Sequence, residues 1–277
     1  MADNEEDDLS YELDEFAEPL PEAREKPMAF FDHLEELRWT LVKSAIAFAV
    51  CAGVIGVFLK RFNEVLTWPL NSVRSDYPTF QLDLGTTSVM EGFTVVIQMC
   101  FVGGLIMAAP LILLFLGQFI APALQECELK LVASGCVAAM VLFLLGICFS
   151  FFLLVPGTIR VSIELNQLFG FITRWTPGSY YGTLIWLTLG VGAAFEFPLL
   201  IILLVHLGLA SSAKLRGWWR HSLVLCFVVA AFVTPTPDPI NQSVLALSLY
   251  FLYWIAIVVA VRVERKQAEA RAKEDQG

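Results

Sequence analysis

The stretch from Leu131 to Val155 reads LVASGCVAAMVLFLLGICFSFFLLV and contains no charged residue. As a helix, its 25 residues would span about 38 Å at 1.5 Å per residue. This length exceeds the roughly 30 Å hydrocarbon core of a bilayer. The stretch therefore predicts a helix that crosses a membrane.

Other apolar runs lie on both sides of this stretch. Four are long enough, or nearly so, to cross a bilayer: Trp39–Leu59, Phe93–Leu116, Thr183–Leu207 and Val244–Val261. Another, Ser222–Thr234, has 13 residues, and a proline-rich segment from Pro235 to Pro239 separates it from the last run. The pattern predicts an all-α polytopic membrane protein with six transmembrane helices, the last two short and hairpin-like.

The overall composition agrees with this class. Hydrophobic residues make up 57% of the 277 residues and charged residues 16%, against roughly a quarter charged in a soluble domain. A single soluble core could not bury so much apolar surface. The six cysteines form no C-x-x-C pair and are interpreted as small apolar fillers.

Both ends of the chain differ from its middle. The first 22 residues carry ten acidic groups and no basic one, which is typical of a solvated tail. The predicted organisation is a disordered acidic tail over residues 1–27, a membrane domain over 28–262 and a charged tail over 263–277.

The basic residues predict the orientation. With the N-terminus inside, thirteen Lys and Arg residues face the cytoplasm and five face the outside. An excess of basic residues is typical of cytoplasmic loops. We therefore expect both termini in the cytoplasm, with two outer loops at Lys60–Gly92 and Pro156–Gly182.

The segment before the first apolar run is amphipathic. Phe30, Leu34, Leu37 and Leu41 share one face at helical spacing, as expected of an interfacial helix that lies on the membrane. Asp32 and Glu35 fit a capping arrangement at its start, which leaves Glu36 without a capping role.

Three further acidic positions need an explanation. Glu126 and Glu128 lie in a short inner loop, where a coincidental acidic loop and a cation-binding site fit equally well. Glu196 lies near the middle of an apolar run, where an ionised carboxylate is costly; function is the default expectation there, and a structural hydrogen bond to a neighbouring helix is the alternative. Asp238, before Pro239, fits either an N-cap of the last helix or a contact role.

No motif for catalysis is present. The sequence contains no phosphate-binding G-x-x-x-x-G-K-[ST], no G-x-S-x-G and no H-E-x-x-H. We therefore expect no enzymatic activity, no catalytic residue, no metal site, no cofactor and no nucleic-acid partner.

Five short strings resemble one family, in order along the chain. They are HLEELR at 33–38, WPL at 68–70, FIAPAL at 119–124 with Glu128, FEFP at 195–198, and TPTPD at 234–238 with Gln242. Together they resemble TatC, the twin-arginine signal receptor of the Tat protein-export pathway. The resemblance covers residues 28–262 and leaves out both tails.

The resemblance implies a receptor and translocase core in the bacterial inner membrane. Such a protein binds twin-arginine signal peptides, assembles with TatA- and TatB-type single-span partners as a multimer, and uses the proton-motive force to export folded proteins. Carried over to this chain, the resemblance implies three sets of residues. They are a signal-peptide site (Glu36, Glu128, Arg38 and Phe119, with Glu126 competing with Glu128), intramembrane polar contacts (Glu196, Thr234 and Gln242) and outer-loop positions (Pro69 and Asp238).

Two other functions fit parts of the pattern. A small-molecule secondary transporter could use Glu196 as its proton or ion carrier, although no internal repeat supports it. A membrane-embedded enzyme would need a nucleophile–base pair or a metal set, and neither is evident.

Overall fold

The structure is a computed structural model that describes residues 30–77, 84–120, 129–171, 174–235 and 238–274. The chain divides into two compact units, residues 1–39 and residues 40–277. Over the described ranges the secondary structure is helical apart from one isolated bridge between Leu84 and Trp175. The predicted all-α class is confirmed.

The helices follow the order of the apolar runs. They are α2 (Phe30–Val57), α3 (Leu59–Leu66), α4 (Trp68–Asp76), α5 (Glu91–Ile120), α6 (Leu129–Phe149), the π-helical turn η3 (Ser150–Leu154), α7 (Val155–Phe169), α8 (Pro177–Phe195), α9 (Phe197–His206), α10 (Ser212–Gly217), α11 (Trp219–Val233) and α12 (Pro239–Glu274).

Among the described residues, five helical segments are long and apolar enough to cross a membrane. They cover Leu34–Val57, Glu91–Phe119, Ala133–Phe169, Pro177–His206 and Pro239–Arg265, and α11 is a shorter apolar helix. The five long runs are thus confirmed as helices. Because α11 has 15 residues and reaches only about 22 Å, a count of six crossings stays a prediction, as does the orientation.

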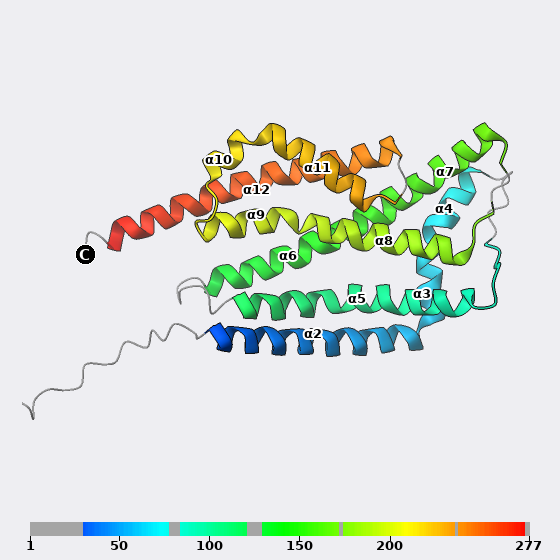
Figure 1. The fold of residues 1–277 in the computed structure, drawn as a ribbon, viewed down its shortest axis with the longest axis horizontal. Coiled ribbons are helices and arrows are strands. Elements are labelled where there is room, and N and C mark those ends of the chain that lie inside the picture. The colour runs from blue at the N-terminus through cyan, green and yellow to red at the C-terminus, as the bar shows by residue number, and fades with distance from the viewer. Residues whose placement is uncertain (1–29, 78–83, 121–128, 172–173, 236–237, 275–277) are drawn as a thin grey trace, which may run out of the picture. The chain divides into compact units, whose positions relative to one another are not determined.

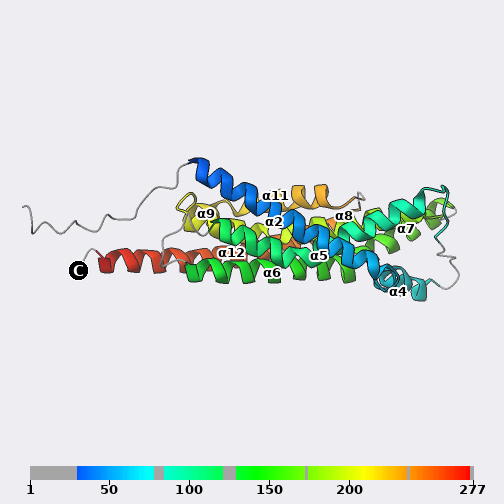
Figure 2. The ribbon, with the colours of Figure 1, turned by 90° about the horizontal axis from the view of Figure 1, so that it is seen from below.

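Two predicted boundaries are wrong. The interfacial helix over Phe30–Leu41 is not a separate element, because α2 continues unbroken from Phe30 to Val57 with no proline or glycine before Thr40 to end it. The last helix is not short, since α12 begins at Pro239 and has 36 residues. Figures 1 and 2 show its C-terminal end extending past α9 and α10.

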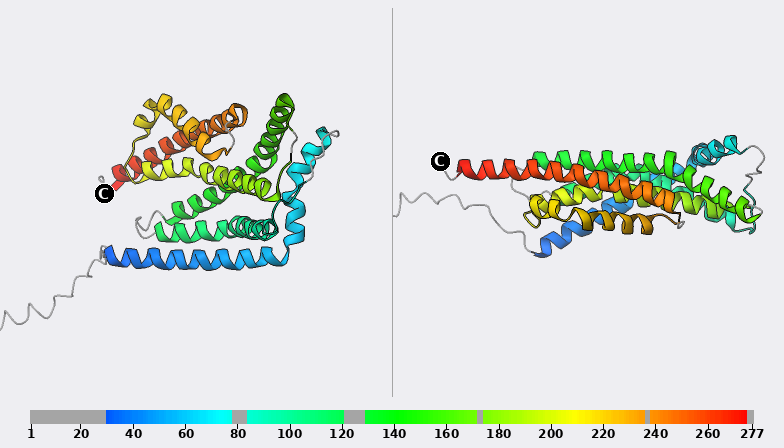
Figure 3. Two further views of the ribbon diagram at one scale, coloured as in Figure 1. Left: turned by 45° about the vertical axis from the view of Figure 1, so that its right-hand side comes forward. Right: turned by 90° about the horizontal axis from the view of Figure 1, so that it is seen from above.

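The segments predicted as outer loops are largely helical. α3 and α4 lie within Lys60–Gly92, and α7 takes up the first half of Pro156–Gly182. We call the end of the second unit that carries α3, α4 and α7 the α4 end, and the opposite one the α10 end (Figure 1). Figure 3 shows α4 and α7 side by side.

A π-helical turn lets the third span continue through Pro156. Proline in an α-helix removes one hydrogen bond and clashes with the carbonyl four residues earlier. Here the turn just before it has the wider π spacing, and the Val155 amide donates to the Ser150 carbonyl. Trp68, at the start of α4, packs on this turn, with its ring 5.9 Å from Phe151 and 5.0 Å from Phe152.

Two further prolines, Pro110 and Pro198, lie within spans and behave differently from each other. Pro110 lies inside α5, which continues from Glu91 to Ile120. Pro198 follows a break, since α8 ends at Phe195 and α9 begins at Phe197. The fourth span therefore has a helix break at Glu196, two residues before Pro198.

Glycines allow the closest helix contacts. A Cβ atom on Gly104 of α5 would lie 2.7 Å from the Cβ of Ala52 on α2, and one on Gly146 of α6 would lie 2.9 Å from the Cα of Gly192 on α8. Small residues permit such backbone approach between membrane helices, where van der Waals packing drives association.

Tyrosines of α8 hold α3 in place at the α4 end. The Tyr180 hydroxyl donates to the Leu66 carbonyl oxygen at 2.7 Å, and the Tyr181 hydroxyl donates to Asn63 Oδ1. Both tyrosine side chains are buried. They join α8 to a helix more than a hundred residues earlier in the chain.

Two polar contacts join α4 to α7. An Arg160 guanidinium nitrogen lies 2.7 Å from Asp76 Oδ2, and the Tyr77 hydroxyl donates to Glu164 Oε1 at 3.1 Å. Partial desolvation is the main cause that raises the pKa of Tyr77 above its usual value, and the hydrogen bond to Glu164 is the second. Because the ion pair is half exposed, it contributes little to stability and chiefly sets orientation.

Candidate functional site

Glu36 lies near the beginning of α2 and has an unsatisfied oxygen. Its side chain is half-buried, whereas those of Glu35 and Arg38 are exposed. The Oε2 atom of Glu36 is fully buried and has no hydrogen-bond partner among the described residues. A buried carboxylate oxygen in this state gains free energy from a cationic partner.

The rest of the predicted signal-peptide site is only partly described. Phe119 lies in the last turn of α5 with a half-buried side chain. Glu126 and Glu128 belong to residues 121–128, outside the described ranges. The pairing of two carboxylates therefore stays a prediction.

Glu196 lies at the break between α8 and α9. It is both the C-cap of α8 and the residue before α9, and its carbonyl accepts from the amides of Leu199 and Leu200 at 3.0 and 3.1 Å. The side chain is half-buried, and Oε1 is fully buried without a hydrogen-bond partner among the described residues. The structural alternative, a hydrogen bond to a neighbouring helix, therefore finds no support for Oε1 in the described part of the chain.

Thr234 and Gln242 are satisfied by the backbone of α11. Thr234 ends α11, and its hydroxyl donates to the Ala230 carbonyl at 2.9 Å. Gln242 Nε2 donates from α12 to the Phe227 carbonyl at 3.4 Å. Over the described ranges neither side chain hydrogen-bonds to Glu196, so the structure does not join the three as one network.

The packing of α8 against α11 nevertheless places Glu196 and the Gln242 hydrogen bond at a similar height along the helices. A Cβ on Gly190 of α8 would lie 3.1 Å from Val233 of α11, and the two helices run in opposite directions (Figure 1). Glu196 lies six residues after Gly190, and Phe227 lies six residues before Val233, so each is about 9 Å along its helix from this contact. Glu196 is therefore about level with Phe227, whose carbonyl accepts from Gln242.

Asp238 is the N-cap of α12. Its Oδ1 accepts from the Asn241 amide at 2.7 Å, and its Oδ2 accepts from Asn241 Nδ2 at 3.0 Å. The same Nδ2 lies 3.3 Å from the Thr158 hydroxyl on α7. The capping role is confirmed, whereas the link from Asn241 to α7 was not predicted. Pro69 is not in a loop, since it is a buried residue in the first turn of α4.

Three more polar atoms within the spans are buried without a hydrogen-bond partner among the described residues. They are Gln98 Oε1, Ser150 Oγ and Thr188 Oγ1. Their only signal in the sequence is a polar side chain within an apolar run, which serine and threonine commonly provide in membrane helices. The described residues also contain no group of three or more His, Cys, Asp or Glu side chains that could hold a metal ion.

Comparison with known proteins identifies the family. Residues 32–247 match the family described as Sec-independent protein translocase protein (TatC). The TatC of Deinococcus radiodurans is 32% identical over 241 residues, which cover 87% of each chain, and that of Koribacter versatilis is 30% identical over 250 residues, which cover 89% of this chain and 90% of the relative.

A solved structure agrees with these relatives. The crystal structure of a twin arginine translocase receptor, TatC, aligns with a TM-score of 0.69 at 29% sequence identity, covering 84% of this chain and 99% of that one. The family transports proteins, so neither an enzyme nor a small-molecule transporter describes this chain. The chain belongs to the TatC family of Sec-independent protein translocases and is a membrane component of the twin-arginine translocase.

Proposed function

We propose that this chain is the receptor that binds twin-arginine signal peptides and then assembles with single-span Tat partners to export folded proteins. The observation that carries the proposal is the Glu36 carboxylate, which has a buried oxygen without a hydrogen-bond partner among the described residues. An arginine of the signal peptide would supply that partner.

The chemistry of arginine supports two carboxylates as the binding groups. A guanidinium is a planar fork that can donate two parallel hydrogen bonds to one carboxylate, whereas lysine offers a point charge. Glu36 would bind one arginine and Glu128 the other, with Glu126 as the alternative to Glu128. Arg38 would orient a carboxylate, and Phe119 would pack against the bound segment.

A second polar region would receive partner helices. Within the described part of the chain Glu196 has a buried oxygen without a hydrogen-bond partner, and Thr234 and Gln242 belong to the neighbouring helices α11 and α12. Polar side chains within a membrane commonly face other helices. We assign these three residues to contacts with TatA- or TatB-type helices or with the inserted signal, with Pro69 and Asp238 on the outer side.

The proposal includes a location and an energy source. The chain would span the bacterial inner membrane six times with both termini in the cytoplasm, as the excess of basic residues on that side favours. It would act within a multimeric receptor complex, and the proton-motive force would drive export.

Peptide binding tests the receptor role. The purified chain is expected to bind a twin-arginine signal peptide about tenfold more tightly than the same peptide with both arginines changed to lysine, because the bidentate hydrogen bonds are lost. Fluorescence anisotropy of labelled peptides measures both affinities. Equal affinities for the two peptides would contradict the proposal.

Glu196 should separate partner assembly from signal recognition. Glu196→Ala is expected to leave peptide affinity within twofold of the unmodified chain but to reduce co-purification of the single-span partners severalfold, because the polar contact is lost. Glu196→Gln retains the shape and a hydrogen-bonding oxygen and should restore most of the assembly. If Glu196→Ala co-purifies with its partners as well as the unmodified chain does, Glu196 does not contact them and its role is structural.

A further inference from the structure

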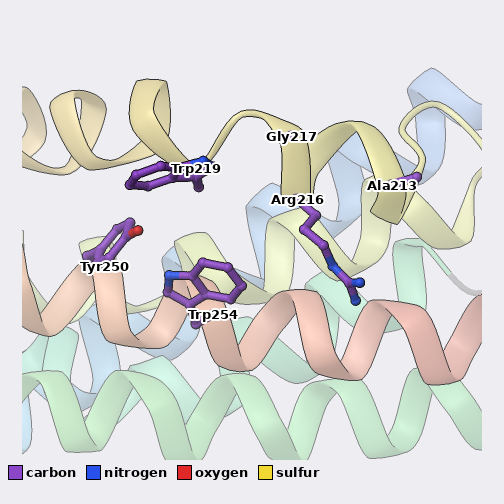
Figure 4. Close-up of a pocket in the computed structure, with 6 residues that line it drawn as sticks. All are labelled: Ala213, Arg216, Gly217, Trp219, Tyr250 and Trp254. Carbon is purple, nitrogen blue, oxygen red and sulfur yellow. The ribbon is translucent and has the colours of Figure 1, made fainter.

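An aromatic and cationic pocket lies at the α10 end, where α10, α11 and α12 meet. Its volume is about 720 Å³, and it is lined by Ala213, Arg216, Gly217, Trp219, Tyr250 and Trp254. Figure 4 shows Trp219 facing Tyr250 and Trp254 across the pocket, with Arg216 reaching from α10 toward α12.

Arg216 has no anionic partner in the described protein. The segment from Leu207 to Val233 contains Lys214, Arg216 and Arg220 but no carboxylate. Glu264 of α12, which contacts the first residue of α10, is already engaged, because its carboxylate accepts from the Ser212 amide at 2.8 Å and from the Ser212 hydroxyl. The pocket therefore has a net positive charge that nothing in its lining neutralises.

The position of the pocket along α12 makes this charge unusual. Tyr253 donates a hydrogen bond of 2.6 Å to the Leu215 carbonyl, which fixes the backbone beside Arg216 at the level of Tyr253. The first charged residue of α12 is Arg262, about 12 Å further along the axis than Trp254. The backbone at Arg216 thus lies beside a part of α12 that is still apolar, and its exposed side chain offers a cation there to water or to an anion.

The aromatic lining restricts the kind of anion. Trp219 and Trp254 are partly exposed within the pocket, and the Tyr250 and Trp254 rings meet edge to face at 6.4 Å. Tryptophan and tyrosine favour the boundary between hydrocarbon and headgroups. A pocket lined by three rings and one exposed arginine suits a molecule with both an apolar chain and an anionic group.

We propose that this pocket binds one anionic glycerophospholipid, with its phosphate on Arg216 and its glycerol and upper acyl chain against Trp219, Tyr250 and Trp254. Charge favours a lipid with a net negative charge over a zwitterionic one. The cation of a zwitterionic headgroup would lie near Arg220, whose guanidinium carbon is 5.1 Å from the Trp219 ring centre. Basic pockets between membrane helices commonly bind such headgroups.

Lipid retention tests the proposal. Native mass spectrometry of the full chain in detergent, with phosphatidylglycerol or phosphatidylcholine added, counts the bound lipid. The unmodified chain should retain phosphatidylglycerol about fivefold better than phosphatidylcholine, the factor expected from one basic residue at a membrane surface. Arg216→Gln should abolish that preference.

Two variants make the test specific. Lys214→Gln removes the same charge from the same helix but lies outside the pocket lining, so its lipid preference should stay within twofold of the unmodified chain. Arg216→Lys keeps the charge and should retain a preference for phosphatidylglycerol, which keeps the proposal testable if Arg216→Gln fails to fold.

Three results would overturn the proposal. One is an equal loss of preference in Arg216→Gln and Lys214→Gln. The second is stabilisation by inorganic phosphate equal to that by phosphatidylglycerol, measured as the apparent unfolding temperature, which would mean a free-anion site. The third is displacement of bound phosphatidylglycerol by a single-span partner whose own binding is unchanged in Arg216→Gln. That result would make the pocket a helix-docking surface.

Discussion

Replacing Glu36 with glutamine is expected to weaken binding of a twin-arginine signal peptide by at least about tenfold and to abolish export of folded cargo. A hydrogen bond to a charged group contributes about 1.5–3 kcal/mol, which corresponds to a factor of roughly 10 to 150 in affinity. Glutamine retains the size of the side chain but cannot accept a bidentate pair from a guanidinium. Peptide anisotropy and an export assay in cells measure the two effects.

Glu35 offers a matched control for this experiment. It is the adjacent carboxylate on the same helix, and its side chain is exposed. Glu35→Gln removes the same charge and should change peptide affinity by less than twofold. Equal weakening in both variants would reduce the effect to net charge, and normal export by Glu36→Gln would exclude Glu36 from the binding site.

Folding of Glu36→Gln is expected to be unimpaired. The Oε2 atom of Glu36 is buried without a hydrogen-bond partner among the described residues. Glutamine keeps the size of the side chain and introduces no new charge at this buried oxygen position. The variant should therefore purify as well as the unmodified chain, which distinguishes lost recognition from lost structure.

Gly104→Ala should cause a large loss of stability. Its Cβ would lie 2.7, 2.8 and 2.9 Å from the Cβ, Cα and N atoms of Ala52, so the clash is partly with backbone. Overpacking of this kind costs about 1–3 kcal/mol, because α2 and α5 would have to separate. The apparent unfolding temperature should fall, as measured by the loss of helical circular dichroism on heating.

Gly53→Ala is the matched control, with the opposite expected sign. Gly53 lies one residue after Ala52 on α2, and a Cβ there would meet nothing within 4 Å. Alanine in a helix interior is more stable than glycine by about 0.5–1 kcal/mol. An unfolding temperature for Gly104→Ala equal to or above that for Gly53→Ala would contradict the packing of α2 on α5.

The apolar runs predicted the long helices because a bilayer requires internally hydrogen-bonded helices of a given length. They could not predict where the third span ends. Pro156 is a sound signal for the end of a helix, and it was overridden by the π turn over Ser150–Leu154. Trp68 packs on that turn, and a contact between residues more than eighty positions apart is not readable from a local pattern.

The candidate site divides in a similar way. The capping role of Asp238 was predictable because its carboxylate and the Asn241 amide that donates to it lie within three residues. The link from Asn241 to Thr158 was not, since those residues are 83 positions apart. Glu196 could be singled out because burying a carboxylate in an apolar run is energetically costly. The helix break at its position could not be predicted, since it lies beside Pro198 and where α8 packs closely on α6.

The contacts at the α4 end also impose an order of events during synthesis. The Leu66 carbonyl receives its hydrogen bond from Tyr180, which is translated 114 residues later. At 5–20 residues per second this interval is roughly 6 to 23 s. During that time α3 lacks the hydrogen bonds that the Tyr180 and Tyr181 hydroxyls later donate to it. A nascent chain that has not yet reached Pro177 would thus have its first membrane helices made and this end still open, and only the fourth span would close it.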